Sequence, residues 1–362
     1  MSYTIVREPK LDELVTANRS RAVGAGIDPN QYEQVTSRLM TVGEWTPAFR
    51  AAALEHRERA DAARDAERHV SAGEAYLHAA RWSHFATCWP NPDRFTHAMS
   101  VADAAGDYRE ALSELDPAAL WIERRTARAP FVGVLRRPRG LSKPPLALIV
   151  CGLDSGKEEF HYVSEALLAR GMATFAFDGP GQAELSATTT IEPEYDRVVA
   201  HLLDTLAGEK NLDIDHGRVG VVALSLGGFY GVKSAAADAR VRALVTVSGV
   251  CSLTWETLPS VVIDTLIQRT GSEQAARAIA ATVDSVRLAK DLTVPLLVVA
   301  GGQDPIPTAA EAQRVAAASP YGELHLVPEG DHLLANAQWQ WLGRAGDWLA
   351  ERLGAGRSLR DG

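Results

Sequence analysis

The stretch 219-VGVVALSLGGFYG-231 decides the fold class of this chain. Four apolar residues run directly into Ser225, and small residues follow at once. The apolar run is typical of a strand buried on both faces, and the glycines allow a helix to begin close to that strand. Ser225 therefore lies where a strand turns into a helix. Two interpretations compete here, a serine that caps the helix and a nucleophile on a tight turn.

The sequence around this stretch alternates between apolar runs and helical patterns, and we take 126–362 as one domain. Such alternation predicts a mostly parallel sheet covered by helices on both faces, an α/β fold. Residues 252–290 interrupt it with mostly helical sequence. The expected strands are 130–136, 145–151, 172–177, 218–224, 241–247, 295–300 and 323–327, and the expected helices are 158–170, 192–208, 227–237, 308–318 and 337–353.

Residues 1–125 have a different character, and we predict a separate all-helical N-terminal domain there. Small and aromatic residues recur at spacings of three and four through 72–86, which is typical of one face of a helix. A second helical pattern covers roughly 93–114, and no convincing strand is visible. Four of the eight tryptophans lie in this part. They are expected to pack in a core, although a cover over an apolar substrate is the alternative.

Composition and charge exclude several classes of protein. The chain has 362 residues and a net charge of −9, which disfavours a nucleic-acid partner. No apolar run is long enough for a membrane span, and the first ten residues lack a signal-peptide core. Three cysteines without a CxxC or Cys/His cluster argue against a zinc site and indicate a reducing cytoplasm. No nucleotide, metal or haem motif is present, so we expect no cofactor.

A serine nucleophile needs a base and an orienting acid, and both follow Ser225 along the chain. Asp304 comes directly after the expected strand 295–300, and His332 comes directly after 323–327. The carboxyl ends of parallel strands share one edge of the sheet, so all three residues are expected there. We therefore predict a Ser225–His332–Asp304 triad.

Each of the two later triad residues has an alternative. Asp304 precedes a proline, as a turn aspartate does. His332 follows Asp331, to which a loop histidine would bond. His325 is a competing base, but it lies inside an expected strand.

The loop 151-CGLDSGKEEF-160 follows the expected strand 145–151 and is predicted to contribute to an oxyanion hole. One donor is expected from the N–H of Leu226, and the second from Gly152 or Leu153. Asp154 lies at the same loop, where it is expected to handle a proton or to bind a polar group of the substrate. Glu158 and Glu159 are interpreted as acids at a helix N-terminus.

These motifs together resemble the α/β-hydrolase superfamily, and within it the group of the dihydroxypseudooxynicotine hydrolase and the fermentation/respiration switch proteins. The resemblance implies a helical N-terminal domain, helical elements covering the site, and a homodimer. It places an additional active-site acid on Asp154, here one methylene shorter than the glutamate of the group. The motifs are 151-CGLDSGKEEF-160, 177-FDGPGQAE-184, Ser225, Asp304 and 329-EGDH-332.

Members of that group cleave a carbon–carbon bond next to a ketone, or an ester. We therefore expect hydrolysis of a small organic molecule by Ser225, with C–C cleavage favoured by Asp154. A carboxylesterase or lactonase, and an acyl-transferring or cyclising enzyme, are the alternatives. Trp255, at the start of the 252–290 insertion, is the expected aromatic side chain of the pocket.

Overall fold

The computed structural model of this protein describes residues 7–355 and divides into two compact units, Met1–Pro117 and Ala118–Gly362. The division lies before residue 125, because β1 (Leu120–Arg124) belongs to the sheet of the second unit. Only Ile122 of this strand is buried. A five-residue edge strand with so little apolar character escapes detection by periodicity, and the expectation that the first 125 residues contain no strand was wrong there.

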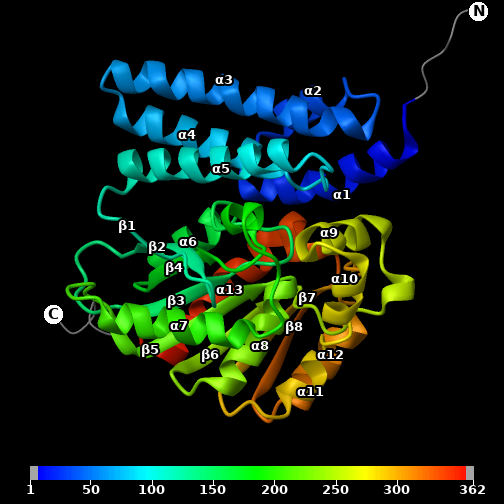
Figure 1. The fold of residues 1–362 in the computed structure, drawn as a ribbon. Coiled ribbons are helices and arrows are strands. Elements are labelled where there is room, and N and C mark those ends of the chain that lie inside the picture. Colours follow the sequence, from blue (N-terminus) through cyan, green and yellow to red (C-terminus); the bar gives the residue numbers. More distant parts are fainter. Residues whose placement is uncertain (1–6, 356–362) are drawn as a thin grey trace, which may run out of the picture. The chain divides into compact units, whose positions relative to one another are not determined.

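The first unit is helical, as expected. Its helices begin with clear signals, since Asp28 and Asp93 cap the second and fifth of them through side-chain acceptors. They are α1 (Pro9–Ala25), α2 (Pro29–Thr36), α3 (Trp45–Asp65), α4 (His69–Phe85) and α5 (Arg94–Leu115), with the short 3-10 helix η1 (Val42–Glu44) between α2 and α3 (Figure 1).

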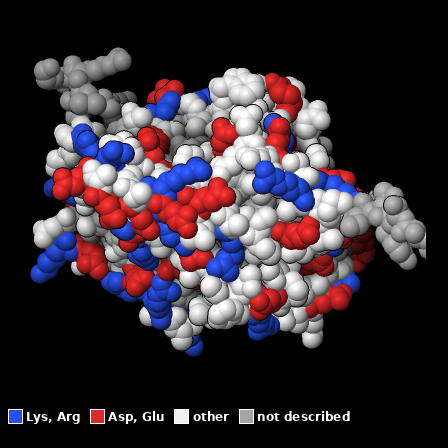
Figure 2. Space-filling model, turned by 90° about the horizontal axis from the view of Figure 1, so that it is seen from above, with Lys and Arg blue, Asp and Glu red and all other residues white. Residues whose placement is uncertain are grey.

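Aromatic side chains form the core of this unit. Trp45 stacks on Phe49 with ring centroids 4.0 Å apart, and Phe49 contacts Trp82 at 5.0 Å. Trp45 and Trp82 are fully buried, so both serve core packing. Ion pairs also join the helices, for example Arg57 to Asp107 through two bonds of 2.7 Å. Basic and acidic side chains are likewise intermixed on the face of the molecule drawn in Figure 2.

Two stacked histidines are expected to make this unit sensitive to acid. His56 of α3 lies on His78 of α4 with ring centroids 5.2 Å apart, and its Nε2 lies 2.9 Å from Oε1 of Gln31. Burial lowers the pKa of each histidine from 6.5 to about 4. Between these values the folded chain binds fewer protons than the unfolded chain, so stability is lost as the pH falls from about 6.5 to about 4.

We expect His78→Gln to reduce this acid sensitivity. The thermal midpoint of the full chain is measured at pH 7 and pH 5. The decrease in the variant should be smaller than in the wild type by roughly 1–2 °C, because the unfolding entropy grows with chain length and about 1 kcal/mol shifts the midpoint of a 362-residue chain by less than that of a shorter domain. His216→Gln, at an exposed histidine, is the matched control and should behave as wild type. An unchanged decrease in His78→Gln would contradict the prediction.

The second unit is built on one eight-stranded sheet in the order β1-β2-β4-β3-β5-β6-β7-β8. β1 and β2 are antiparallel to their neighbours, and β3 through β8 are mutually parallel. The expected α/β architecture is therefore confirmed. The remaining strands are β2 (Phe131–Arg136), β3 (Pro145–Val150), β4 (Ala173–Asp178), β5 (Asp215–Leu224), β6 (Val241–Val247), β7 (Leu296–Gly301) and β8 (Gly322–Val327).

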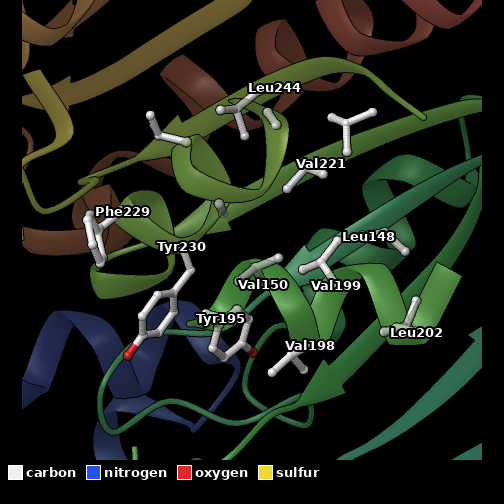
Figure 3. Close-up of a cluster of buried hydrophobic side chains, with 14 of the residues drawn as sticks. Leu148, Val150, Tyr195, Val198, Val199, Leu202, Val221, Phe229, Tyr230 and Leu244 are labelled. Atoms are coloured by element: carbon white, nitrogen blue, oxygen red, sulfur yellow. The ribbon is translucent and has the colours of Figure 1, made fainter. Parts of the chain in front are cut away.

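Helices cover both faces of this sheet, and each face has its own apolar core. On one face, Leu148 and Val150 of β3 meet side chains of α7 and α8 (Figure 3). On the other, Ala147 and Ile149 of the same strand meet α6 and α13. This alternation explains why the strands are continuous apolar runs. The helices are α6 (His161–Leu168), α7 (Tyr195–Gly208), α8 (Leu226–Ala237), α12 (Ala309–Ala318) and α13 (Gln338–Leu353).

The 252–290 insertion is helical, as the sequence indicates. The hydroxyl of Ser285 donates to the carbonyl of Val250 at 2.7 Å and so anchors the insertion beside the end of β6. Its elements are the 3-10 helix η3 (Trp255–Thr257), α9 (Ser260–Thr270), α10 (Glu273–Ala280) and α11 (Ser285–Ala289). Among residues 7–355, no helix combines the length and the apolar character that crossing a bilayer requires.

Candidate active site

Ser225 occupies a strained turn between β5 and α8. Its φ is 57° and its ψ is −126°, a conformation that residues with a side chain rarely adopt. Gly227 allows the helix to start this close to the sheet. A Cβ at that position would lie 2.4 Å from the carbonyl oxygen of Val150 and 2.6 Å from that of Cys151. The turn therefore has the geometry of a nucleophile elbow.

The first position of the elbow carries Ala223 where the usual pattern has glycine. The structure accommodates this methyl group because Gly231 faces it from α8. A Cβ on Gly231 would lie 2.7 Å from the Cβ of Ala223. There is room for only one Cβ between these two positions, so the glycine that the motif lacks at residue 223 is found instead at Gly231 of α8.

Gly227→Ala is expected to damage the site more than a methyl group usually does. The added Cβ would collide with two backbone oxygens that cannot rotate away, so α8 or the loop after β3 must shift. A displacement of about 1 Å costs on the order of 10²-fold in rate, which a hydrolysis assay measures. Gly106→Ala is the control, because a Cβ at Gly106 meets nothing within 4 Å. Equal rates in both variants would argue against this account.

The structure brings the three predicted residues together. Nε2 of His332 lies 3.0 Å from Oγ of Ser225. Nδ1 of His332 lies 3.1 Å from each carboxylate oxygen of Asp304, whose side chain is buried. The N–H of Ile306 donates to Oδ1 of Asp304 at 2.8 Å and fixes that carboxylate. This order of contacts allows proton transfer from the serine hydroxyl to an oriented imidazole.

The loop that carries His332 is held by a residue that sequence reasoning missed. Ser248, fully buried at the end of β6, accepts a hydrogen bond of 2.8 Å from the N–H of Leu333. Leu333 and Leu334 both have positive φ, 66° and 50°. A backbone in this region needs external support, and the Ser248 hydroxyl supplies it. No local pattern marks Ser248, since its partner is distant in the sequence.

The predicted oxyanion loop lies against the nucleophile. A Cβ on Gly152 would be 2.9 Å from Cβ of Ser225 and 3.3 Å from its Oγ. Leu226 begins α8, and its N–H is one of the first-turn donors that have no partner within the helix. Leu153 is the next residue of the loop and is half-buried. Burial raises the pKa of the Cys151 thiol well above its usual range, which is unfavourable for a thiolate nucleophile.

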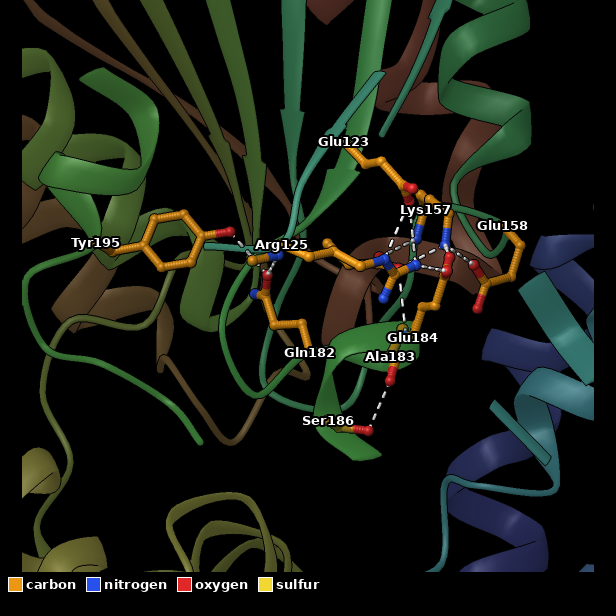
Figure 4. A network of polar contacts seen from close by, with 11 residues as sticks. Glu123, Arg125, Lys157, Glu158, Gln182, Ala183, Glu184, Ser186 and Tyr195 are labelled. Atoms are coloured by element: carbon orange, nitrogen blue, oxygen red, sulfur yellow. Dashed lines mark hydrogen bonds and ion pairs between the residues drawn. The ribbon is translucent and has the colours of Figure 1, made fainter. Parts of the chain in front are cut away.

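The same loop contains a buried charge cluster (Figure 4). Lys157 is fully buried, and its Nζ lies 2.6 Å from Oδ2 of Asp178 and 3.0 Å from Oε2 of Glu184. Glu158 is 3.6 Å from the same ammonium. The interpretation of Glu158 and Glu159 as helix-terminal acids was wrong, because both are buried before α6 begins. Burial raises the pKa of Asp178 to about 6, although Lys157 opposes the shift.

The roles of the last two candidates, Asp154 and Trp255, stay predictions. Asp154 follows Leu153 on the oxyanion loop and is half-buried, so its role stays a prediction. Trp255 packs within the insertion, where the guanidinium of Arg277 lies 4.6 Å from its ring.

The described residues 7–355 contain no group of three His, Cys, Asp or Glu side chains arranged to hold a metal ion.

The sheet and the contacts of Ser225, His332 and Asp304 are those of an α/β-hydrolase. The chain belongs to the FrsA-like esterase family, because the model of the family described as "Esterase FrsA-like" matches residues 36–354. Its family and the proteins similar to it are hydrolases, so the chain is a hydrolase.

Among the similar proteins is the 2,6-dihydropseudooxynicotine hydrolase of Paenarthrobacter nicotinovorans, 28% identical over 87% of this chain and 86% of its own. The 20-hydroxy-prefusarin hydrolase of Gibberella moniliformis is 30% identical over 62% of this chain and 58% of its own. A crystal structure of the 2,6-dihydroxy-pseudo-oxynicotine hydrolase superposes with a TM-score of 0.82 at 25% identity, covering 92% of this chain and 95% of that chain. The expected family and fold are thereby confirmed.

Proposed function

We propose that Ser225, His332 and Asp304 form a catalytic triad that hydrolyses a carbon–carbon bond next to a ketone in a small organic substrate. The observation that carries the proposal is the hydrogen-bonded series from Asp304 through His332 to Ser225 at a strained elbow. Support for a ketone substrate comes from the dihydroxypseudooxynicotine hydrolase, to which the chain is similar over most of its length.

The arrangement of these residues is consistent with each step of such a reaction. Oγ of Ser225 attacks the ketone carbon while His332 accepts its proton. The N–H groups of Leu226 and Leu153 stabilise the resulting oxyanion. When the C–C bond breaks, its electron pair leaves on carbon, and the imidazolium of His332 or the carboxyl group of Asp154 returns a proton. Water then cleaves the acyl-enzyme, so that ketone and water yield a carboxylic acid and a C–H product.

Ester hydrolysis is the second candidate, favoured by the family description. The same residues would serve it, with an alkoxide as the leaving group. The two reactions differ in what they demand after the C–C or C–O bond breaks, because a carbanion needs a proton more urgently than an alkoxide does.

The deciding experiment compares wild type and Ser225→Ala on an aryl ester and an aryl β-diketone in ¹⁸O-labelled water. We expect diketone cleavage with one ¹⁸O in the acid product, and its loss in the variant. Ser37→Ala, at an exposed serine, should retain full activity. Turnover of the ester alone would favour an esterase, and a product without solvent oxygen would favour cyclisation. Activity that survives Ser225→Ala would contradict the covalent mechanism.

The homodimer implied by the family resemblance is also part of this proposal, together with a cytoplasmic location and a small molecule as the partner. Sedimentation of the purified chain checks the first of these.

A further inference from the structure

The side chain of Gln182 makes four hydrogen bonds around the oxyanion loop. It lies in 177-FDGPGQAE-184, after β4, and is 1% exposed. Its Nε2 donates to the carbonyl oxygens of Cys151 at 2.7 Å and Gly152 at 2.9 Å. Its Oε1 accepts from the N–H of Gly179 at 2.8 Å and from the hydroxyl of Tyr195 at 2.7 Å (Figure 4).

These contacts fix the orientation of the Gln182 amide. A backbone N–H can only donate, so the N–H of Gly179 requires the oxygen of the amide on its side. The nitrogen must then face Cys151 and Gly152, whose carbonyl oxygens can only accept. Both amide hydrogens are donated, and the amide oxygen accepts two hydrogen bonds. An amide rotated by 180° would place its NH₂ group against the N–H of Gly179 and its oxygen against the two carbonyl oxygens.

The bound carbonyl groups determine where the neighbouring N–H groups point. In a planar trans peptide, C=O and N–H point in opposite directions. Because Gln182 binds the oxygens of Cys151 and Gly152, the N–H groups of Gly152 and Leu153 point away from it. Within the described residues, the N–H of Leu153 donates to no backbone oxygen. The loop turns the Cα of Gly152 toward Ser225, which places these donors beside the nucleophile.

The support of Gln182 extends to the helix that follows the nucleophile. Tyr195 of α7 is fully buried and stacks on Tyr230 of α8, with ring centroids 4.1 Å apart and an interplanar angle of 5°. Gln182 is therefore held by a side chain that also packs against the helix beginning at Leu226. These contacts thus connect the loop donors to the helix that carries the Leu226 donor.

We propose that Gln182 is the positioning residue of the oxyanion hole: it binds the carbonyl groups of Cys151 and Gly152 and thereby directs the N–H of Leu153 at the oxygen of the substrate carbonyl. This inference rests on the proposed attack by Ser225. It concerns the transition state, because a carbonyl oxygen gains its negative charge only during that attack.

The test variant is Gln182→Glu, which keeps the acceptor for Gly179 and Tyr195 and removes the donating NH₂ group. We expect kcat to fall by about 10²–10³-fold, as when one oxyanion donor is lost, with KM changing far less. The affinity for an aryl trifluoromethyl ketone, which forms an oxyanion adduct with the serine, should fall by a similar factor. Gln313→Glu, at an exposed glutamine of α12, is the matched control.

Gln182→Met is the second variant, because it introduces no buried charge and so serves if Gln182→Glu does not fold. A wild-type kcat and wild-type ketone affinity in either folded variant would overturn the proposal. So would a decrease in kcat that only equals the decrease in the fraction of folded, active protein. The wild type and Ser225→Ala are measured alongside. Adduct formation that persists in Ser225→Ala would refute the proposed function itself, independently of the result at Gln182.

Discussion

Replacement of His332 by alanine is expected to lower kcat by roughly 10⁴–10⁶-fold, the loss seen when the base of a serine triad is removed. Its Nε2 lies 3.0 Å from the Ser225 hydroxyl, and no other group then accepts the proton. The side chain of His332 is 37% exposed, so its removal should leave the thermal midpoint nearly unchanged. Hydrolysis rates and labelling of Ser225 by a fluorophosphonate measure the effect.

His325→Ala is the control for this prediction. His325 lies in β8, and its Nε2 is 3.0 Å from the carbonyl oxygen of Gln340, in a separate contact. It was the competing base in the sequence, and the structure gives it a structural partner. We expect wild-type activity in this variant. Loss of activity in His325→Ala combined with retention in His332→Ala would reverse the assignment of the base.

Lys157→Met is expected to destabilise the protein by about 3–5 kcal/mol, the cost of leaving a buried charge unpaired. The ammonium is fully buried between Asp178 and Glu184. Without it, these carboxylates must either remain charged in an apolar site or take up protons. Chemical denaturation of the full chain measures the loss. Lys290→Met, at an exposed lysine, should change stability by less than about 0.5 kcal/mol.

The loss in Lys157→Met should also depend on pH. Burial already raises the pKa of Asp178 from 3.8 to about 6, and removal of the cation raises it further. A carboxyl group with a raised pKa binds more protons in the folded chain, so its effect on stability worsens as pH rises through that pKa. The variant should therefore be less destabilised at pH 5 than at pH 8. A loss that grows toward acid would contradict this account of the cluster.

The sequence predicts the triad because the relevant information is local. Ser225 and Asp304 come shortly after buried apolar strands, His332 follows the partly exposed strand β8, and the ends of parallel strands meet at one edge. The elbow at Ser225 and the order of Asp304 and His332 can therefore be found without coordinates. The strands themselves are recognisable because the cores on both sheet faces make them continuously apolar.

The supporting residues could not be predicted in the same way. Gln182 binds carbonyl groups about thirty positions earlier, and Ser248 binds an N–H 85 positions later. Such pairs arise when two loops meet, and neither loop carries a periodic pattern that reports the meeting. The burial of Lys157 could not be predicted from the sequence either, because a run of charged residues is usually exposed to solvent.

Each parallel strand of the sheet is followed by a segment that carries at least one residue proposed to act in catalysis or to position a catalytic group. The segments after β4, β3, β5, β6, β7 and β8 contribute Gln182, Gly152 with Leu153, Ser225, Ser248, Asp304 and His332, respectively. The 252–290 insertion contributes none of them. The insertion can therefore vary in sequence without changing the contacts among these residues. Because Trp255, the expected aromatic side chain of the pocket, lies in this insertion, we expect that exchange of the insertion between relatives changes substrate preference while the contacts of Ser225 are kept.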